Sequence, residues 1–320
     1  MTHGHDLIHS KLSRLEFTLM MSMVMAVTAL AIDMMLPAFG DMRAEFGLAA
    51  DSNTIALVVT VFLLGLGFGQ PLWGPLSDSL GRKPVLYAGL AVYVIGALGA
   101  ALSGSLTVLL VARFVGGFGA AGPRVVSQGV VRDAYKGEAM AKVMSYVMAA
   151  FILIPILAPS IGAAILAIGS WHTTFIAIAA FGIIVGVWTL RLPETLPEQR
   201  RIPLSFAKLG LAARSVMTNR FTMGLTFAQA VIFGFFASYL ASSQLFIDDV
   251  YGLDDLFPFV FGGQAVVLGI GMITNPRLLD RFGLRMILRS VFITYLVMTI
   301  ILLTAAVGFG GAPPFWLFVG

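Results

Sequence analysis

Long apolar runs separated by short polar segments make up almost the whole chain. A helix needs about 20 apolar residues to cross roughly 30 Å of hydrocarbon. Membrane-crossing strands would instead give segments of about ten residues with alternating polarity, and the sequence has none. The runs therefore predict membrane-spanning helices near residues 17–39, 54–74, 85–104, 106–128, 142–166, 171–191, 222–247, 256–275 and 287–309.

A tenth apolar segment opens at Pro314 and reaches the last residue, Gly320. Its last six residues would rise only about 9 Å as a helix, which is too short to cross a bilayer. The pattern therefore predicts about nine full spans and the start of a tenth.

The composition favours a protein embedded in lipid. Charged residues make up 11% of the chain and hydrophobic residues 58%, and the mean hydropathy is +0.94. A soluble domain would carry about a quarter charged residues. Cysteine is absent, which excludes a disulfide framework and a thiolate metal site.

Basic residues gather in alternate loops, and this distribution predicts the orientation of the chain. They precede the first span, follow the second, fourth and eighth, and crowd the long loop after the sixth. Because lysine and arginine are enriched in cytoplasmic loops, we expect the N-terminus and the long loop in the cytoplasm of a multi-pass inner-membrane protein. The basic residues that give the chain its net charge of +4 therefore serve to orient the loops. We expect no nucleic-acid partner.

One polar segment divides the chain. Arg191–Arg220 carries three prolines and a dense run of charge, and it predicts a linker with a surface helix near Pro203–Thr218. The expected domains are an N-terminal six-helix bundle at 1–191, a cytoplasmic linker at 192–221 and a partial C-terminal bundle at 222–320.

Two loops indicate an internal repeat. Gly74–Lys83 follows the second span and Pro276–Arg285 follows the eighth. Asp78 then aligns with Asp280 and Gly81 with Gly283, at the same offset of 202 residues. Two related halves are typical of transporters built from parallel repeats.

Four motifs carry a resemblance to a known family. The loop Gly74–Lys83 resembles the signature G-x-L-x-D-x-x-G-R-K of the major facilitator superfamily. Three further segments are similar to drug/proton antiporters of the Bcr/CflA, or bicyclomycin-resistance, type: Asp33–Ala38, the Arg113 to Asp133 region with its R-x-x-x-G and V-R-D patterns, and Ala158–Ala163, which is similar to the antiporter motif G-P-x-x-G-G.

This resemblance implies an all-α membrane protein with the major facilitator fold, in which two six-helix bundles are related by a parallel repeat. The second bundle would be incomplete here, as in a C-terminally truncated member. The implied activity is bicyclomycin-type multidrug efflux by drug/proton antiport, with the proton gradient as energy source and no cofactor. We expect a monomer in the lipid bilayer that exchanges protons for a small lipophilic or cationic drug-like substrate.

Asp33 and Arg113 are the expected proton-coupling or substrate residues. Both are charged side chains inside predicted spans, where charge is costly and functional more often than incidental. An acid in a cavity that opens and closes can bind and release protons, and the resemblance implies a role in coupling for the arginine. The alternatives are an acid that caps or pairs near its helix end and an arginine that only bonds backbone carbonyls.

Two further motifs suggest conformational roles. The loop residues Gly74, Asp78, Gly81, Arg82 and Lys83 predict a tight charged turn whose acid stabilises a helix N-terminus in one conformation. The resemblance implies span 11 as the partner helix. Small residues permit close helix approach, and the resemblance makes the segment with Pro159 and Gly162 the antiporter seal between the halves, although generic packing is the alternative.

Sequence motifs for enzymes are missing. There is no G-x-x-x-x-G-K-[ST] loop, no H-E-x-x-H and no G-x-S-x-G, so we expect no enzymatic activity. Gly117–Gly122 matches G-x-G-x-x-G but lies inside a span without a preceding strand. Two alternatives to efflux stay open: a metabolite/proton symporter on the same fold, and a truncated membrane protein that does not transport.

Overall fold

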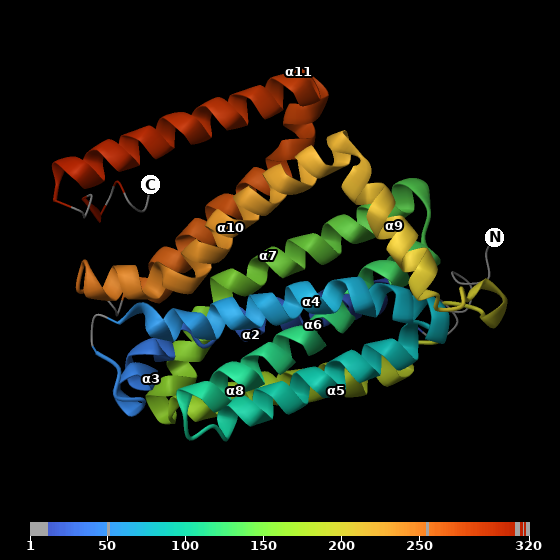
Figure 1. Cartoon of the computed structure of the whole chain (residues 1–320), viewed down its shortest axis with the longest axis horizontal. Coiled ribbons are helices and arrows are strands. Elements are labelled where there is room, and N and C mark those ends of the chain that lie inside the picture. Colours follow the sequence, from blue (N-terminus) through green and yellow to red (C-terminus); the bar gives the residue numbers. More distant parts are fainter. Residues whose placement is uncertain (1–11, 50–51, 254–255, 311–313, 316, 318–320) are drawn as a thin grey trace.

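The computed structural model describes residues 12–49, 52–253, 256–310, 314–315 and 317, and this part of the chain consists of helices and short connections (Figure 1). The first half forms one bundle of packed helices. Its elements are α2 (Arg14–Asp33), α3 (Phe39–Glu45), α4 (Leu57–Leu80), α5 (Arg82–Ala101), α6 (Leu106–Ala134), α7 (Gly137–Ile168) and α8 (Trp171–Trp188).

Small residues bring α6 close to two neighbours. A Cβ atom added at Gly117 would lie 2.0 Å from the carbonyl oxygen of Phe62 in α4, and one at Gly119 would lie 2.2 Å from the amide nitrogen of Tyr93 in α5. Glycine at these positions lets helix backbones touch, as is common between membrane helices. The segment Gly117–Gly122 matches G-x-G-x-x-G, a pattern found in dinucleotide-binding loops. In this structure its glycines belong to a helix-packing face.

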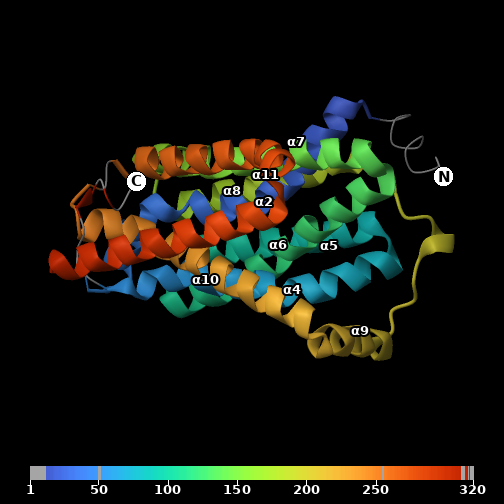
Figure 2. The same ribbon diagram turned by 90° about the horizontal axis from the view of Figure 1, so that it is seen from above.

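The second half is more open. It contains α9 (Phe206–Thr218) in the polar linker segment, α10 (Arg220–Asp249) and α11 (Phe257–Gly308). In Figures 1 and 2, α10 and the first part of α11 lie beside the first bundle, and the last part of α11 extends away from it. Contacts join α11 to α7, and Figure 2 shows one stretch of α11 running alongside α7.

Gly283 interrupts α11 with φ 73° and ψ 156°. Gly81, its counterpart in the repeat, separates α4 from α5 with φ 107° and ψ 160°. Only glycine adopts this region of backbone space without strain. The two aligned loops thus share an unusual conformation, which agrees with the internal repeat, while the side chain of Asp280 lies outside the described residues.

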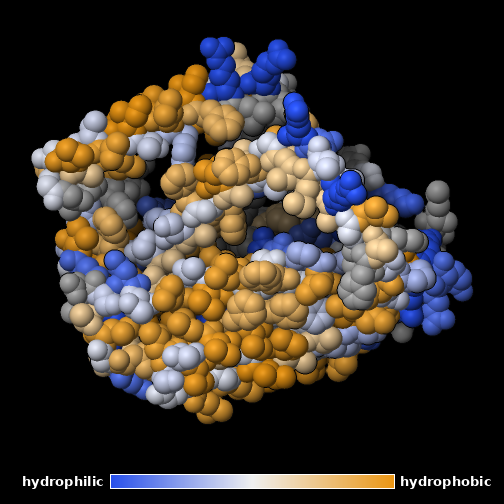
Figure 3. All heavy atoms as spheres, viewed as in Figure 1, coloured by the Kyte–Doolittle hydropathy of each residue, from blue (hydrophilic) through white to orange (hydrophobic). Residues whose placement is uncertain are grey.

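Seven helices in the described part of the chain are long and apolar enough to cross a membrane. The predicted span at 142–166 falls on α7 and the one at 256–275 on the start of α11. The apolar stretches described there are shorter than a full span: Leu157–Ile168 in α7 and Phe257–Gly271 in α11. The predicted tenth segment lies largely outside the described residues. Apolar side chains cover much of the face in Figure 3. In the first bundle, Leu64, Phe68 and Ile95 are each more than half exposed.

The first span ends earlier than the apolar run predicts. The helix stops at Asp33, and a 3-10 turn (Leu36–Ala38) with Pro37 leads into α3. Proline lacks an amide hydrogen and disrupts a continuing helix. The break turns residues 39–45 into a separate short helix and leaves Asp33 at a helix end.

Candidate functional site

Asp33 lies at the buried end of α2, with only 2% of its surface exposed. Among the residues the structure describes, none donates a hydrogen bond to its Oδ1 atom. A buried polar atom without a partner is costly, and such an atom usually has a function or a missing ligand. Asp33 is therefore suited to bind a proton or a polar group of a substrate.

The motif around Gly162 packs directly beside this acid. A Cβ atom at Gly162 would lie 1.9 Å from the carbonyl oxygen of Met34, the residue after Asp33. Pro159, one turn earlier in α7, is buried. The predicted seal motif thus forms the contact between α7 and the end of α2 within the first bundle.

Arg113 is buried in α6 and bonds backbone atoms of two other helices. Its Nε donates to the carbonyl oxygen of Val58 at 3.1 Å and its Nη2 to that of Ala31 at 3.0 Å. The guanidinium also lies 4.2 Å from the ring centre of Phe62, which is a favourable cation–π distance.

No ion pair joins Arg113 to Asp33 among the described residues. Arg113 instead donates a hydrogen bond to the carbonyl oxygen of Ala31 in α2, two residues before Asp33. In this conformation its bonds match the backbone-bonding alternative, and a direct role with Asp33 stays a prediction.

The second half contributes polar and aromatic groups near Asp33. Tyr239 of α10 interacts electrostatically with Asp33, and its hydroxyl donates to Oε1 of Gln264 in α11. Its ring is stacked on Phe261, with ring centres 6.1 Å apart. Figure 3 shows the molecule hollowed between α10 and the helices of the first half. Asp33 therefore lies where residues of the two halves come together.

Arg82 organises the loop between α4 and α5. Its Nη1 donates to Oδ1 of Asp78 at 2.5 Å and to Ser77 Oγ at 2.7 Å, and its Nε donates to Oδ2 of Asp133 at 2.8 Å. These bonds tie the loop to the end of α6. Two carboxylates that hold one guanidinium make a strong charge-assisted cluster.

Glu194 caps α5 from the segment after α8. Its Oε1 accepts from the amide of Arg82 and its Oε2 from the amide of Lys83, both at 3.0 Å. A carboxylate at a helix N-terminus satisfies free amides and complements the helix dipole. A Cβ at Gly81 would lie 2.7 Å from Glu194 Oε2, so this glycine is required both by its positive φ and by the cap.

The remaining loop residues contribute less. Lys83 donates through Nζ to the carbonyl oxygen of Leu190 at 2.9 Å. A Cβ at Gly74 would meet only Val125 at 3.8 Å, so this structure gives no packing reason for glycine there. The carboxylate of Asp78 contacts Arg82 of the same loop. A switching role for the loop stays a prediction.

Glu194→Gln is expected to lower the free energy of unfolding by about 1 kcal/mol, the usual range for a lost helix cap or dipole interaction. The amide can accept only through its single oxygen and carries no charge. Thermal unfolding in detergent measures the change. Glu198→Gln is the matched control, because Glu198 is highly exposed and contacts Arg201 only at 3.7 Å. Equal stability of the two variants would contradict the capping role.

Arg43 and Asp249 join the two halves at the opposite end of the molecule from Arg82. Nη1 of Arg43 donates to Oδ1 of Asp249 at 3.0 Å, and Nη2 donates to Oδ2 at 2.9 Å. The arginine side chain is 7% exposed and the aspartate 29%. Figure 1 shows the end of α10 beside the start of α4, with α3 at the same end of the molecule, so the pair closes one end of the interface between halves.

Asp249→Asn is expected to weaken this closure by about 1–2 kcal/mol, less than a fully buried pair because Asp249 is partly exposed. Ser243, which is buried in α10 six positions before Asp249, reports opening. The chain has no cysteine, so Ser243→Cys gives a single labelling site, and its labelling rate should rise roughly tenfold. The charge swap Arg43→Asp with Asp249→Arg should restore slow labelling. If the swap labels as fast as the single variant, the pair does not hold the halves.

Sequence reasoning missed two of these contacts. In the sequence, Arg43 and Asp249 are only two charges in separate polar loops, and Glu194 is one of several charges in the segment after the sixth predicted span. The sequence contains one signal for Arg43: it is the one lysine or arginine in the loops that alternate with the basic loops. An ion pair between residues 206 positions apart has no signature in local periodicity.

Comparison with known proteins gives the family. Residues 21–320 match the sequence profile described as Major Facilitator Superfamily. The chain is 32% identical over 299 residues to an uncharacterized MFS-type transporter, YdgK, of Bacillus subtilis, covering 91% of this chain and 73% of the relative. It is 29% identical over 306 residues to a bicyclomycin resistance protein homolog of Haemophilus influenzae, covering 94% and 75%.

A chloramphenicol resistance protein of Pseudomonas aeruginosa is 33% identical over 215 residues, which cover 66% of this chain and 50% of that protein. Among solved structures, a D-xylose-proton symporter superposes with a TM-score of 0.65 at 15% identity, covering 84% of this chain and 69% of the symporter. At that identity the likeness shows the fold, which is that of membrane transporters and not of enzymes. Because the family profile covers residues 21–320, the chain belongs to the major facilitator superfamily.

Proposed function

We propose that the chain exports drug-like molecules by drug/proton antiport across the inner membrane. The observation that carries the proposal is Asp33, a carboxylic acid buried where the two halves meet and without a partner for Oδ1 among the described residues. A lone acid at this place can hold either a proton or a polar or cationic group of a substrate. Competition between these two occupants couples their opposite movements.

The surroundings of Asp33 suit a lipophilic substrate. Tyr239 and Phe261 present stacked aromatic rings, and aromatic faces attract organic cations. The names of the bicyclomycin and chloramphenicol resistance relatives support drugs as the substrate class. No further cofactor enters the proposal, because the proton gradient supplies the energy.

The two ends of the halves support alternating access. Arg43 and Asp249 close one end, while the Arg82 cluster lies at the other end, where Figure 1 shows α10 diverging from the first bundle. Rocking of two repeat-related bundles around a central site would open each end in turn. Breaking the Arg43–Asp249 pair would be one step of that movement.

Everted membrane vesicles test the direction and the coupling. With an inward-acid gradient, the chain should drive uptake of ethidium or chloramphenicol into the vesicles, and an uncoupler should abolish it. Uptake that instead requires the opposite gradient direction would indicate a symporter that imports its substrate. Absence of gradient-dependent movement for both drugs, with protein present in the membrane, would contradict the proposal.

The proposed orientation places the N-terminus and α9 in the cytoplasm, because the basic loops alternate with acidic ones. Reporter fusions at Arg200 and Arg281 should report the cytoplasm, and a fusion at Asp249 should report the outer side. The position of Asp249 decides the matter, since a cytoplasmic report there would invert or rearrange the spans.

A further inference from the structure

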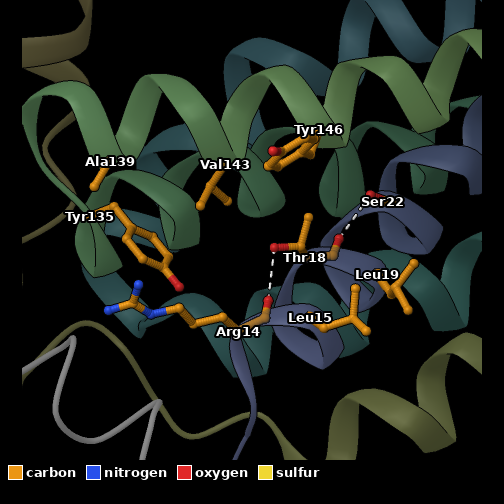
Figure 4. Close-up of a pocket in the computed structure, with 9 residues that line it drawn as sticks. All are labelled: Arg14, Leu15, Thr18, Leu19, Ser22, Tyr135, Ala139, Val143 and Tyr146. Atoms are coloured by element: carbon orange, nitrogen blue, oxygen red, sulfur yellow. Dashed lines mark hydrogen bonds between the residues drawn. The ribbon is translucent and has the colours of Figure 1, made fainter.

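A cavity of about 460 Å³ lies outside the proposed transport site, between the first turns of α2 and α7 (Figure 4). Most of its wall is apolar, and Leu15 is 70% exposed and Leu19 44% exposed beside it. It is lined by Arg14, Leu15, Thr18, Leu19, Ser22, Tyr135, Ala139, Val143 and Tyr146.

Arg14 supplies the only formal charge among the described residues of this lining. No carboxylate in the described part of the chain forms an ion pair with it, and the nearby Glu16 pairs with Arg191 instead, at 3.1 Å. The two smaller polar side chains are already used, since the hydroxyl of Thr18 donates to the Arg14 carbonyl and that of Ser22 to the Thr18 carbonyl, both at 2.8 Å. The guanidinium therefore faces an apolar cavity and has no carboxylate partner among the side chains that the structure describes.

Tyr135 stands beside this cation. Figure 4 shows its hydroxyl and the Arg14 guanidinium at the same end of the cavity, and its ring contacts Phe17 with ring centres 5.6 Å apart. Burial raises the pKa of Tyr135, although Arg14 acts in the opposite direction. The phenol thus stays protonated at physiological pH and can donate a hydrogen bond to an anion.

The cavity lies at the ends of two candidate membrane spans. Arg14 is the first residue of α2, and Tyr135 directly follows α6. In the proposed orientation these ends reach the cytoplasmic leaflet, where acidic lipids attract basic residues and where basic pockets between spans bind lipid head groups. One ligand class matches all these features: an amphiphile with an anionic head and an acyl chain.

We propose that this cavity binds an acidic phospholipid of the cytoplasmic leaflet, with its phosphate against Arg14 and Tyr135 and an acyl chain along Leu15 and Leu19. The proposal rests on the proposed orientation but not on transport. Lipid binding is measured without a gradient, so its failure and the failure of antiport are separate results.

The test is native mass spectrometry of the purified chain with phosphatidylglycerol or phosphatidylcholine added at equal concentration. One phosphatidylglycerol should bind more tightly than phosphatidylcholine. Arg14→Gln should weaken this binding about fivefold, the effect of one basic residue near a charged surface. Arg132→Gln is the matched control, because Arg132 is exposed at the same end of the bundle and does not line the cavity.

A second variant, Leu19→Trp, keeps the charge of Arg14 and fills the apolar part of the cavity. Leu19→Trp should also weaken phosphatidylglycerol binding, while inorganic phosphate at the same concentration should not displace the lipid. Three results would each overturn the proposal. The two lipids could bind equally well, Arg14→Gln could bind phosphatidylglycerol as tightly as the parent, or Arg132→Gln could lose as much phosphatidylglycerol binding as Arg14→Gln. A fourth result, occupancy by ethidium that depends on Arg14 while phosphatidylglycerol binding does not, would overturn it as well.

Discussion

Replacing Asp33 with asparagine is expected to reduce gradient-driven drug accumulation to about the outside concentration while leaving the protein folded. Asparagine keeps the size of the buried side chain but cannot gain or lose a proton. One charge that moves through 100 mV supplies about 2.3 kcal/mol. When one charge moves for each neutral drug molecule, this free energy sustains a drug concentration ratio of roughly 50, and the variant should lose that ratio.

Downhill exchange separates coupling from binding in this variant. If Asp33 carries the proton, Asp33→Asn should still exchange labelled chloramphenicol for unlabelled drug, because a neutral substrate does not need the charge. Purified protein should release no protons when drug is added. Asp41→Asn is the matched control, since Asp41 is an exposed acid in α3 and should behave as the parent does. Proton release and pumping at the parental rate in Asp33→Asn would show that this acid is structural.

Arg113 affects the same site through the backbone. Its Nε and Nη2 atoms reach carbonyls on two helices, and the Ala31 bond lies two residues before Asp33. The planar fork of arginine can make both bonds, whereas lysine presents a single point charge. The arrangement explains how an arginine could position the acid without pairing with it.

Apolar run length and repeat alignment predicted much of this fold from the sequence. Membrane helices must satisfy their backbone internally, so long apolar runs leave few alternatives. The offset of 202 residues correctly paired Gly81 with Gly283, because a conformation available only to glycine leaves a visible mark in sequence. Burial of Asp33 and Arg113 was likewise predictable from their place inside apolar runs.

The partners of these residues were not predictable. Arg113 bonds carbonyl oxygens, which every residue carries, so no side-chain pattern marks them. Glu194 caps a helix 112 positions earlier in the chain, and Arg43 meets Asp249 only when the halves come together. Each contact depends on tertiary placement, which the period of a helix does not encode.

Gly162→Ala is expected to destabilise the protein, although alanine is the better helix former by about 1 kcal/mol. The added methyl carbon would lie 1.9 Å from the Met34 carbonyl oxygen and 2.9 Å from its carbon. Both are backbone atoms of α2, which cannot turn aside as a flexible side chain can. Overpacking of this kind costs about 1–3 kcal/mol, so the clash should outweigh the gain in helix propensity.

The expected result is a lower melting temperature in detergent for Gly162→Ala, together with impaired drug exchange, because α7 must move away from the helix end that carries Asp33. Gly186→Ala is the matched control. It places the same methyl group inside α8, where the nearest atom is a Leu90 methyl at 3.8 Å, and it should be neutral or slightly stabilising. Because both substitutions raise helix propensity by the same amount, the difference between the two melting temperatures measures the effect of the clash with Met34. A Gly162→Ala protein as stable as Gly186→Ala would show that α2 and α7 do not pack this closely beside Asp33.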